Sequence, residues 1–127
     1  MCGFFAGDTM NLLLRFCLEL AALAGIGMAA FQAGESIIGY AFAIAAVLLA
    51  AATWGIFNVP DDPSRSGKAP VRVSGPVRLI IELAILLGGS LAFHLAGHSW
   101  IALAHAALIA LHYALSGERL RWLLKQS

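Results

Sequence analysis

Long runs of apolar residues, separated by short polar breaks, dominate this chain. Four runs approach the roughly 20 residues that an α-helix needs to cross a bilayer, and their apolar positions surround the helix instead of forming one stripe. Short joints at Gly34-Glu35 and Gly97-His98 connect the runs in pairs, and glycine favours a helix end there. We therefore predict an all-α membrane protein with four transmembrane helices, at residues 11–33, 36–57, 75–96 and 99–116.

The composition indicates that lipid is the solvent of these helices. Hydrophobic residues make up 61% of the 127 residues and charged residues 12%, with a mean hydropathy of +0.85, whereas soluble domains have about 45–50% and about 25%. A chain of this length cannot bury so much apolar surface in its own core. The net charge of +1 comes with no basic stripe, which argues against nucleic acid as a partner. The expected partners are the lipid bilayer and either further copies of the chain or a larger membrane complex.

The basic residues that lie outside the spans predict the orientation of the spans. They lie between the second and third spans and in the C-terminal tail, whereas the two joints carry none. By the positive-inside rule, both termini are then cytoplasmic. The tail, residues 117–127, mixes leucine and tryptophan with basic residues, so we expect it to lie along the inner membrane surface, or else to be a frayed helix end. The basic residues outside the spans are Arg65, Lys68, Arg72, Arg119, Arg121 and Lys125.

The first ten residues have neither the basic segment nor the small-residue cleavage site of a signal peptide. Met10 is an alternative start, because the apolar pattern begins directly after it. Cys2 and Cys17 have no redox or metal-ligand spacing, and a thiol within an apolar helix behaves as a small hydrophobic group. We infer no cysteine chemistry.

The chain matches itself when it is shifted by 63 positions. Arg15 then falls on Arg78 and Glu19 on Glu82, without a gap between residues 11–57 and 74–120. This predicts a single membrane domain made of a first repeat (11–57), a cytoplasmic linker (58–74), a second repeat (75–120) and the interfacial tail (117–127). Each repeat has two spans, so both repeats enter the membrane in the same direction, as parallel repeats do.

Small residues recur every four positions along the first and third spans. Such ridges allow helix backbones to approach closely. We therefore expect the first and third spans to pack at the centre and the other two outside them. The alternative is that each ridge packs on its own hairpin partner. The ridge residues are Ala21, Gly25 and Ala29 in the first span and Ala84, Gly88 and Ala92 in the third.

Two charged pairs lie within the apolar spans, Arg15 with Glu19 and Arg78 with Glu82. The spacing of four residues places each pair on one helix face, where an ion pair can form. An ionisable group in the hydrocarbon centre costs at least about 2.5–3.5 kcal/mol, so these residues require an explanation. One interpretation is a structural lock between the repeats, and the other is a cytoplasm-facing site for an ion or small molecule.

The polar linker offers further candidates, because Asp61, Asp62, Arg65 and Lys68 are suited to binding a cation or a phosphate. Its proline, glycine and serine residues favour turns, and a plain linker between repeats explains the same composition. The linker also carries motifs of a known family: W-G-x-F-x-x-P from Trp54 to Pro60, then R-S-G-K-A-P-V and G-P-V-R-L-x-x-E-L.

On these motifs the chain resembles the YrdB-like family of bacterial four-span membrane proteins, from about Asn11 to beyond the fourth span. The residues before Met10 depart from the family pattern. The resemblance implies a four-span architecture in the bacterial cytoplasmic membrane. It implies no activity, because the family is one of unknown function.

Four histidines, His94, His98, His105 and His112, occur only in the second repeat. His105 and His112 are about 10.5 Å apart along a helix, too far to share a metal ion. A site formed by His94, His98 and His105, or axial haem ligation, is chemically possible. Single histidines bonded to backbone carbonyls are the commoner arrangement, and we expect no cofactor.

Three functions fit this sequence. The first and favoured one is a small carrier or pore that uses Arg15, Glu19, Arg78 and Glu82. The second is an accessory or scaffolding subunit of a larger membrane complex, and the third is a membrane enzyme acting on a lipid or cofactor head group. The sequence favours a protein that is not an enzyme.

Overall fold

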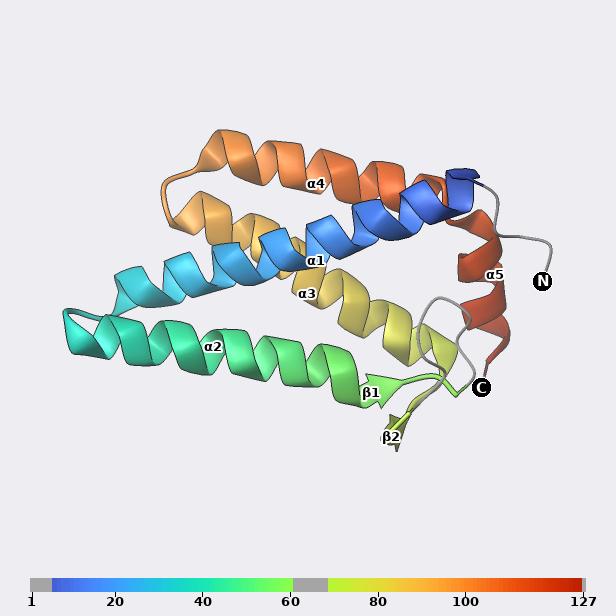
Figure 1. Cartoon of the computed structure of the whole chain (residues 1–127), viewed down its shortest axis with the longest axis horizontal. Helices are drawn as coiled ribbons and strands as arrows, with labels where there is room; N and C mark the ends of the chain where they lie inside the picture. The colour runs from blue at the N-terminus through green and yellow to red at the C-terminus, as the bar shows by residue number, and fades with distance from the viewer. Residues whose placement is uncertain (1–5, 61–68, 127) are drawn as a thin grey trace.

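The computed structural model describes residues 6–60 and 69–126. Four long helices lie side by side in two hairpins, and a shorter helix lies across one end of them (Figure 1). The helices are α1 (Ala6–Ala33), α2 (Ile37–Ile56), α3 (Gly75–Leu95), α4 (Ser99–Ala114) and α5 (Gly117–Lys125). Two short strands, β1 (Phe57–Asn58) and β2 (Val71–Arg72), lie between α2 and α3. The predicted all-helical class is confirmed.

Three of the described helices are each long and apolar enough to cross a bilayer, namely α2, α3 and the part of α1 from Met10 to Ala33. The fourth predicted span is shorter than expected, because α4 has 16 residues and ends at Ala114. At 1.5 Å per residue it is about 24 Å long, less than the roughly 30 Å of a hydrocarbon core. The chain then bends by 72° into α5, so a fourth crossing requires that the bent pair be taken as one span.

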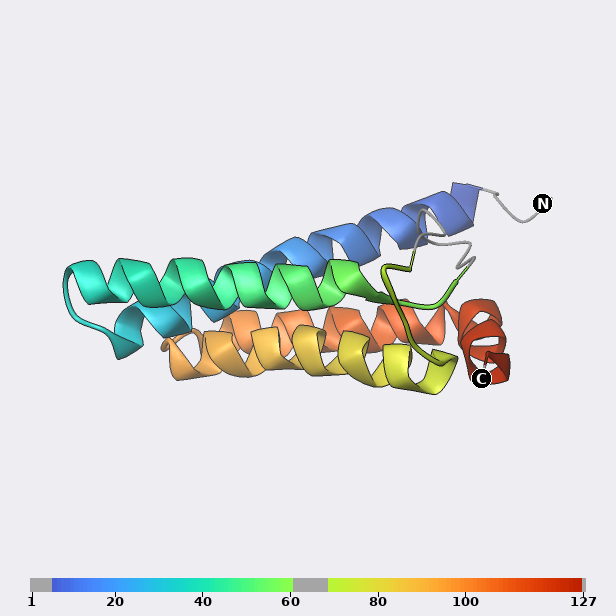
Figure 2. The same cartoon turned by 90° about the horizontal axis from the view of Figure 1, so that it is seen from below.

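The bend after α4 allows α5 to pack on the start of α3. The backbone N–H of Gly75 donates to the carbonyl of Gln126 at 2.8 Å. A Cβ atom at Gly75 would overlap the carbonyl of Leu123, so only glycine permits this approach. Figure 2 shows α5 lying across the end of the hairpins, beside the start of α3 and the end of α4.

The two hairpin joints lie together at the opposite end of the molecule (Figure 1). α3 ends in a Schellman motif, in which the N–H of His98 donates to the carbonyl of Phe93 at 2.8 Å. Gly97 has a φ of +94°, a conformation that favours glycine. In the other joint, a Cβ atom at Gly34 would come within 2.7 Å of the backbone nitrogen of Gly39, which keeps the turn tight.

α1 and α3 pack closely and lie between α4 and α2 in Figure 1. The small residues in contact are Ala22 and Gly25 of α1 and Gly89 of α3. A Cβ atom at Gly89 would lie 2.5 Å from the Cα of Ala22, and one at Gly25 would lie 2.8 Å from the carbonyl oxygen of Gly89. The predicted ridge residue Gly88 instead has open space beside it. The close contact is therefore one residue later on α3 than the predicted ridge of small residues implied.

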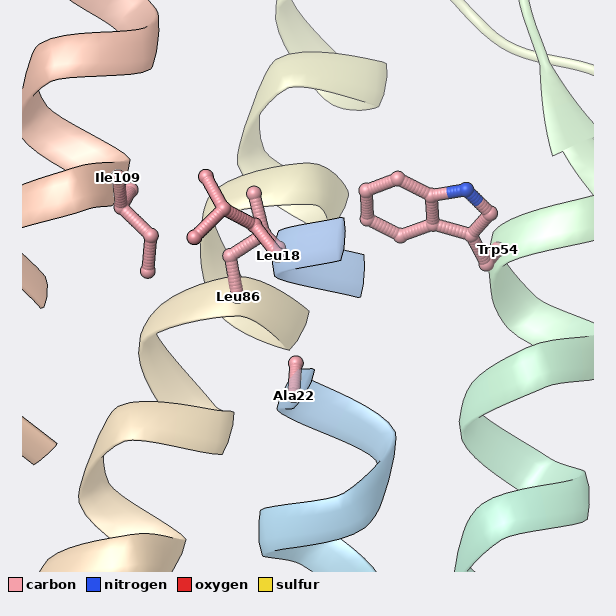
Figure 3. Close-up of a cluster of buried hydrophobic side chains, with 5 residues drawn as sticks. All are labelled: Leu18, Ala22, Trp54, Leu86 and Ile109. Atoms are coloured by element: carbon pink, nitrogen blue, oxygen red, sulfur yellow. The ribbon is translucent and has the colours of Figure 1, made fainter. Parts of the chain in front are cut away.

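The buried apolar cluster lies directly beside this crossing. Leu18 and Ala22 of α1 pack with Leu86 of α3, between Ile109 of α4 and Trp54 of α2 (Figure 3). Leu86 and Ala22 are completely buried. Contributions from all four long helices fix how the two hairpins pack on each other.

The linker contains a short paired element that its turn-rich composition did not predict. β1 and β2 pair in parallel, with Phe57 opposite Val71 and Asn58 opposite Arg72. The N–H of Val73 extends the pairing by donating to the carbonyl of Asn58 at 3.0 Å. This element holds the end of α2 next to the start of α3.

The glycine pair of α3 provides a test of the crossing. Gly89→Ala should lower stability by about 1–3 kcal/mol, because its Cβ has no room against the α1 backbone. Gly88→Ala, the matched control, should be neutral or stabilising by up to about 1 kcal/mol. Thermal unfolding in detergent measures both, and equal stability of the two variants would show that this contact does not hold α1 on α3.

Candidate functional site

A single carboxylate, that of Glu82 on α3, lies at the centre of a polar cluster inside the apolar bundle. Its side chain has no exposed surface. Arg78 donates from Nε to Oε2 at 2.9 Å, and Arg15 donates from Nη2 to the same oxygen at 3.2 Å. Arg119 forms a two-pronged pair, with distances of 2.8 Å to Oε1 and 2.6 Å to Oε2. The Tyr113 hydroxyl donates to Oε1 at 2.9 Å.

These partners come from four of the helices, so Glu82 links most of the fold. Arg15 lies on α1, Arg78 on α3, Tyr113 on α4 and Arg119 on α5. Arg78 extends the network to the end of α2, because its Nη1 donates at 2.8 Å to the carbonyls of both Trp54 and Phe57. A buried charge is tolerated when its hydrogen-bonding capacity is met in this way.

The indole of Trp54 lies against the guanidinium groups of this cluster. The Cζ of Arg78 is 4.7 Å from the ring centroid and that of Arg15 is 5.7 Å from it. Both distances allow a cation–π attraction, which strengthens where water is excluded. Trp54 thus joins the apolar cluster to the polar one.

The two Arg–Glu pairs that match in the sequence differ in the structure. Both form ion pairs at the spacing of four residues, Arg15 with Glu19 at 3.3 Å and Arg78 with Glu82 at 2.9 Å. Arg15 also reaches Glu82, so the pairs meet in one cluster. Glu82 is enclosed, whereas the side chain of Glu19 is 18% exposed. Glu19 is therefore the more accessible of the two carboxylates.

A groove of about 170 Å³, partly open to the surface, has Glu19 among its lining residues. It lies between α1, α2 and α3, and its other lining residues are apolar or aromatic. Arg15, Arg78 and Arg119 do not line it. The lining residues are Phe16, Glu19, Leu20, Leu23, Ala51, Trp54 and Ile85.

The structure does not bring the histidines together into a metal site. His105 is buried and bonded at both ring nitrogens: Nε2 donates to the Leu18 carbonyl at 3.0 Å, and Nδ1 accepts from the Ser90 hydroxyl at 2.6 Å. His94 lies near the surface, 2.9 Å from the Ser99 hydroxyl. Over residues 6–60 and 69–126, no three His, Cys, Asp or Glu side chains lie close enough to hold a metal ion.

His112 belongs to a separate hydrogen-bond chain between α1 and α4. Its Nδ1 donates to the side-chain oxygen of Asn11 at 2.9 Å, and the Asn11 amide donates to the Ser116 hydroxyl at 2.8 Å. Ser116 in turn donates to the carbonyl of His112 at 2.7 Å. Just beyond the end of α4 at Ala114, the Ser116 hydroxyl thus donates to a helix carbonyl in the way that a backbone N–H does within the helix.

The linker candidates Asp61, Asp62, Arg65 and Lys68 lie outside the described residues.

Two residues of the cluster, Arg119 and Tyr113, were absent from the sequence-based site. The sequence signal for Arg119 is weak: the apolar Leu123 follows four residues later, on the same face of α5. Arg121 and Lys125 are exposed, so only Arg119 among the basic residues of α5 points inward. Tyr113 has no comparable signal.

The comparisons with known proteins agree with the family resemblance. The sequence profile of a family described as "Protein of unknown function (DUF2568)" matches residues 13–110. The chain belongs to this family. An uncharacterized protein of Bacillus subtilis (strain 168), YrdB, is 39% identical over 116 residues, which are 91% of this chain and 94% of that protein. No solved structure matches the chain.

The inequality of the two carboxylates can be measured. Glu82→Gln removes the negative charge that three buried guanidinium groups share, so it should cost about 3–5 kcal/mol. Glu19→Gln should cost clearly less than Glu82→Gln, because the Glu19 carboxylate lies at the edge of the cluster and is partly exposed. Unfolding by SDS titration in mixed micelles compares them. Equal losses would mean that Glu82 and Glu19 contribute alike to stability.

Proposed function

We propose that this protein is a small membrane carrier that binds an ion or small molecule at the Arg15–Glu19 edge of the buried cluster. The observation that carries the proposal is the groove beside Glu19, because it leads from the surface to an ionisable group inside an apolar bundle. Charged groups at such depth are expensive in lipid, and in membrane proteins they mark ion and substrate sites.

The different surroundings of the Glu82 and Glu19 carboxylates support this function. Glu82 receives donors from four residues, so it accounts for the structural lock without any help from Glu19. Glu19 lies about 13.5 Å along the apolar part of α1, measured from Met10 at 1.5 Å per residue. Glu19 pairs with Arg15 at the edge of the cluster, and a partly exposed carboxylate at that depth is suited to a ligand.

The proposed orientation places both termini and the linker in the cytoplasm. In support, α5 and the short strands lie at one end of the hairpins and the joints lie at the other (Figure 1). The exposed cations Arg72, Arg121 and Lys125 all lie at the α5 end. In this arrangement α4 and the bent α5 together bring the chain back to the cytoplasmic surface.

The orientation predicts the behaviour of a C-terminal reporter. A green fluorescent protein fused after residue 127 should fluoresce in a bacterial host, and alkaline phosphatase fused there should stay inactive, since it needs the oxidising periplasm. Fusions at Glu35, in the joint between α1 and α2, serve as the control and should give the reverse pattern. A phosphatase-active C-terminus would contradict the proposed topology.

Transport itself can be tested by electrical recording. Proteoliposomes adsorbed on a solid-supported membrane should give protein-dependent currents with members of a panel of inorganic ions, organic cations and organic anions. Glu19→Gln should reduce the active current at least tenfold, whereas Glu35→Gln, at an exposed carboxylate in the joint, should leave it unchanged.

Two results would contradict the carrier. One is the absence of current with every member of the panel, and the other is a current that Glu19→Gln leaves intact. Purification from native membrane in mild detergent gives an independent check, because a stable larger assembly together with no current favours the accessory-subunit alternative.

A further inference from the structure

The groove beside Glu19 has one charged lining residue, and its sign indicates the ligand. We infer that the groove binds a lipophilic cation, a molecule with an apolar aromatic or aliphatic body and one positive charge. This inference rests on the proposed function, because it takes the same Arg15–Glu19 edge as the binding site. It adds the substrate class and the route by which the substrate enters.

The first step is the apolar character of the groove. Six of its seven lining residues are alanine, leucine, isoleucine or aromatic, and two of them, Phe16 and Leu20, are more than half exposed on the outer side of α1. In a bilayer this side of α1 faces lipid, so a molecule reaches the groove through the hydrocarbon. Only a lipophilic compound concentrates there.

The second step is size. A volume of about 170 Å³ compares with the roughly 150 Å³ of an engineered apolar cavity that binds benzene. The groove therefore holds one aromatic ring or a short alkyl segment, and the remainder of a larger ligand stays in the lipid. Two of the lining residues, Phe16 and Trp54, are aromatic, and aromatic rings attract cations.

The third step is charge. Glu19 is the only ionisable residue among the seven that line the groove. The neighbouring Arg15 side chain is only 4% exposed, and Arg78 and Arg119 are turned toward Glu82. The arginines balance Glu82 within the cluster, and Glu19 is the charge that lies in the groove wall, so direct contact there favours a cation over an anion.

The fourth step is the exchange of partners that binding requires. Arg15 is shared between Glu19 at 3.3 Å and Glu82 at 3.2 Å. When a cationic ligand pairs with Glu19, Arg15 keeps its contact with Glu82, so the lock on the four helices stays closed. The contact of Arg15 with Glu82 therefore does not depend on the ligand at Glu19.

Two probe ions of the same size and opposite charge test this inference. Tetraphenylphosphonium and tetraphenylborate present the same four phenyl rings. Calorimetric titration into protein-loaded nanodiscs of neutral lipid, with empty discs subtracted, should show saturable binding of the phosphonium and none of the borate. Binding of the borate alone would overturn the inference, since it would show that the arginines set the sign of the site.

Paired variants then locate the binding. Glu19→Gln should weaken phosphonium binding at least tenfold. Ala51→Leu, which fills the groove from α2 without changing any charge, should do the same. Ala52→Leu is the matched control, because Ala52 is the next exposed alanine of α2 and does not line the groove, and it should stay within twofold of the parent protein.

Thermal unfolding of each variant confirms that it is folded before binding is compared. Equal binding by the Ala51 and Ala52 variants, or full binding by folded Glu19→Gln, would overturn the groove as the site. The outcome is separable from that of the carrier: phosphonium binding that needs Glu19, with no current across proteoliposomes, keeps the site and rejects transport. A Glu19-dependent current carried only by other ions keeps transport and rejects the lipophilic cation.

Discussion

A carboxylate buried in an apolar bundle needs donors on every side, and at Glu82 those donors come from α1, α3, α4 and α5. The helices cannot rearrange independently around it. α5 must lie across the start of α3 for Arg119 to form its two-pronged pair, and α2 must end where its last carbonyls receive Arg78. The close contact of Gly89 with Ala22 holds α1 and α3 near enough for Arg15 to complete the set.

Much of this arrangement could be predicted from the sequence. The apolar runs predicted the four long helices to within a few residues at most ends, and the spacing of four residues predicted both Arg–Glu ion pairs. The placement of α1 and α3 between the other two helices followed from their small residues. These features are local, or they follow from helical periodicity, so one sequence is enough to suggest them.

Other features depend on tertiary geometry that a sequence pattern does not encode. The ridge of small residues predicted that Gly88 contacts α1, but the rotation of α3 brings Gly89 to α1 instead. Arg119 was assigned to an interfacial tail because that tail mixes basic residues with leucine and tryptophan, and only the docking of α5 turns it inward. Tyr113 lies on a helix whose apolar residues run all round, so nothing in the pattern distinguishes a tyrosine that faces a buried carboxylate. The proposed duplication stays a prediction.

The dependence of Glu82 on Arg119 has a consequence for the order in which the fold assembles. Arg78 lies four residues from Glu82 on the same helix, whereas Arg119 lies 37 positions away on α5. The pair with Arg78 can therefore form as soon as α3 is helical, and it offsets the charge of Glu82 until α5 docks. The docking of α5 then completes the cluster.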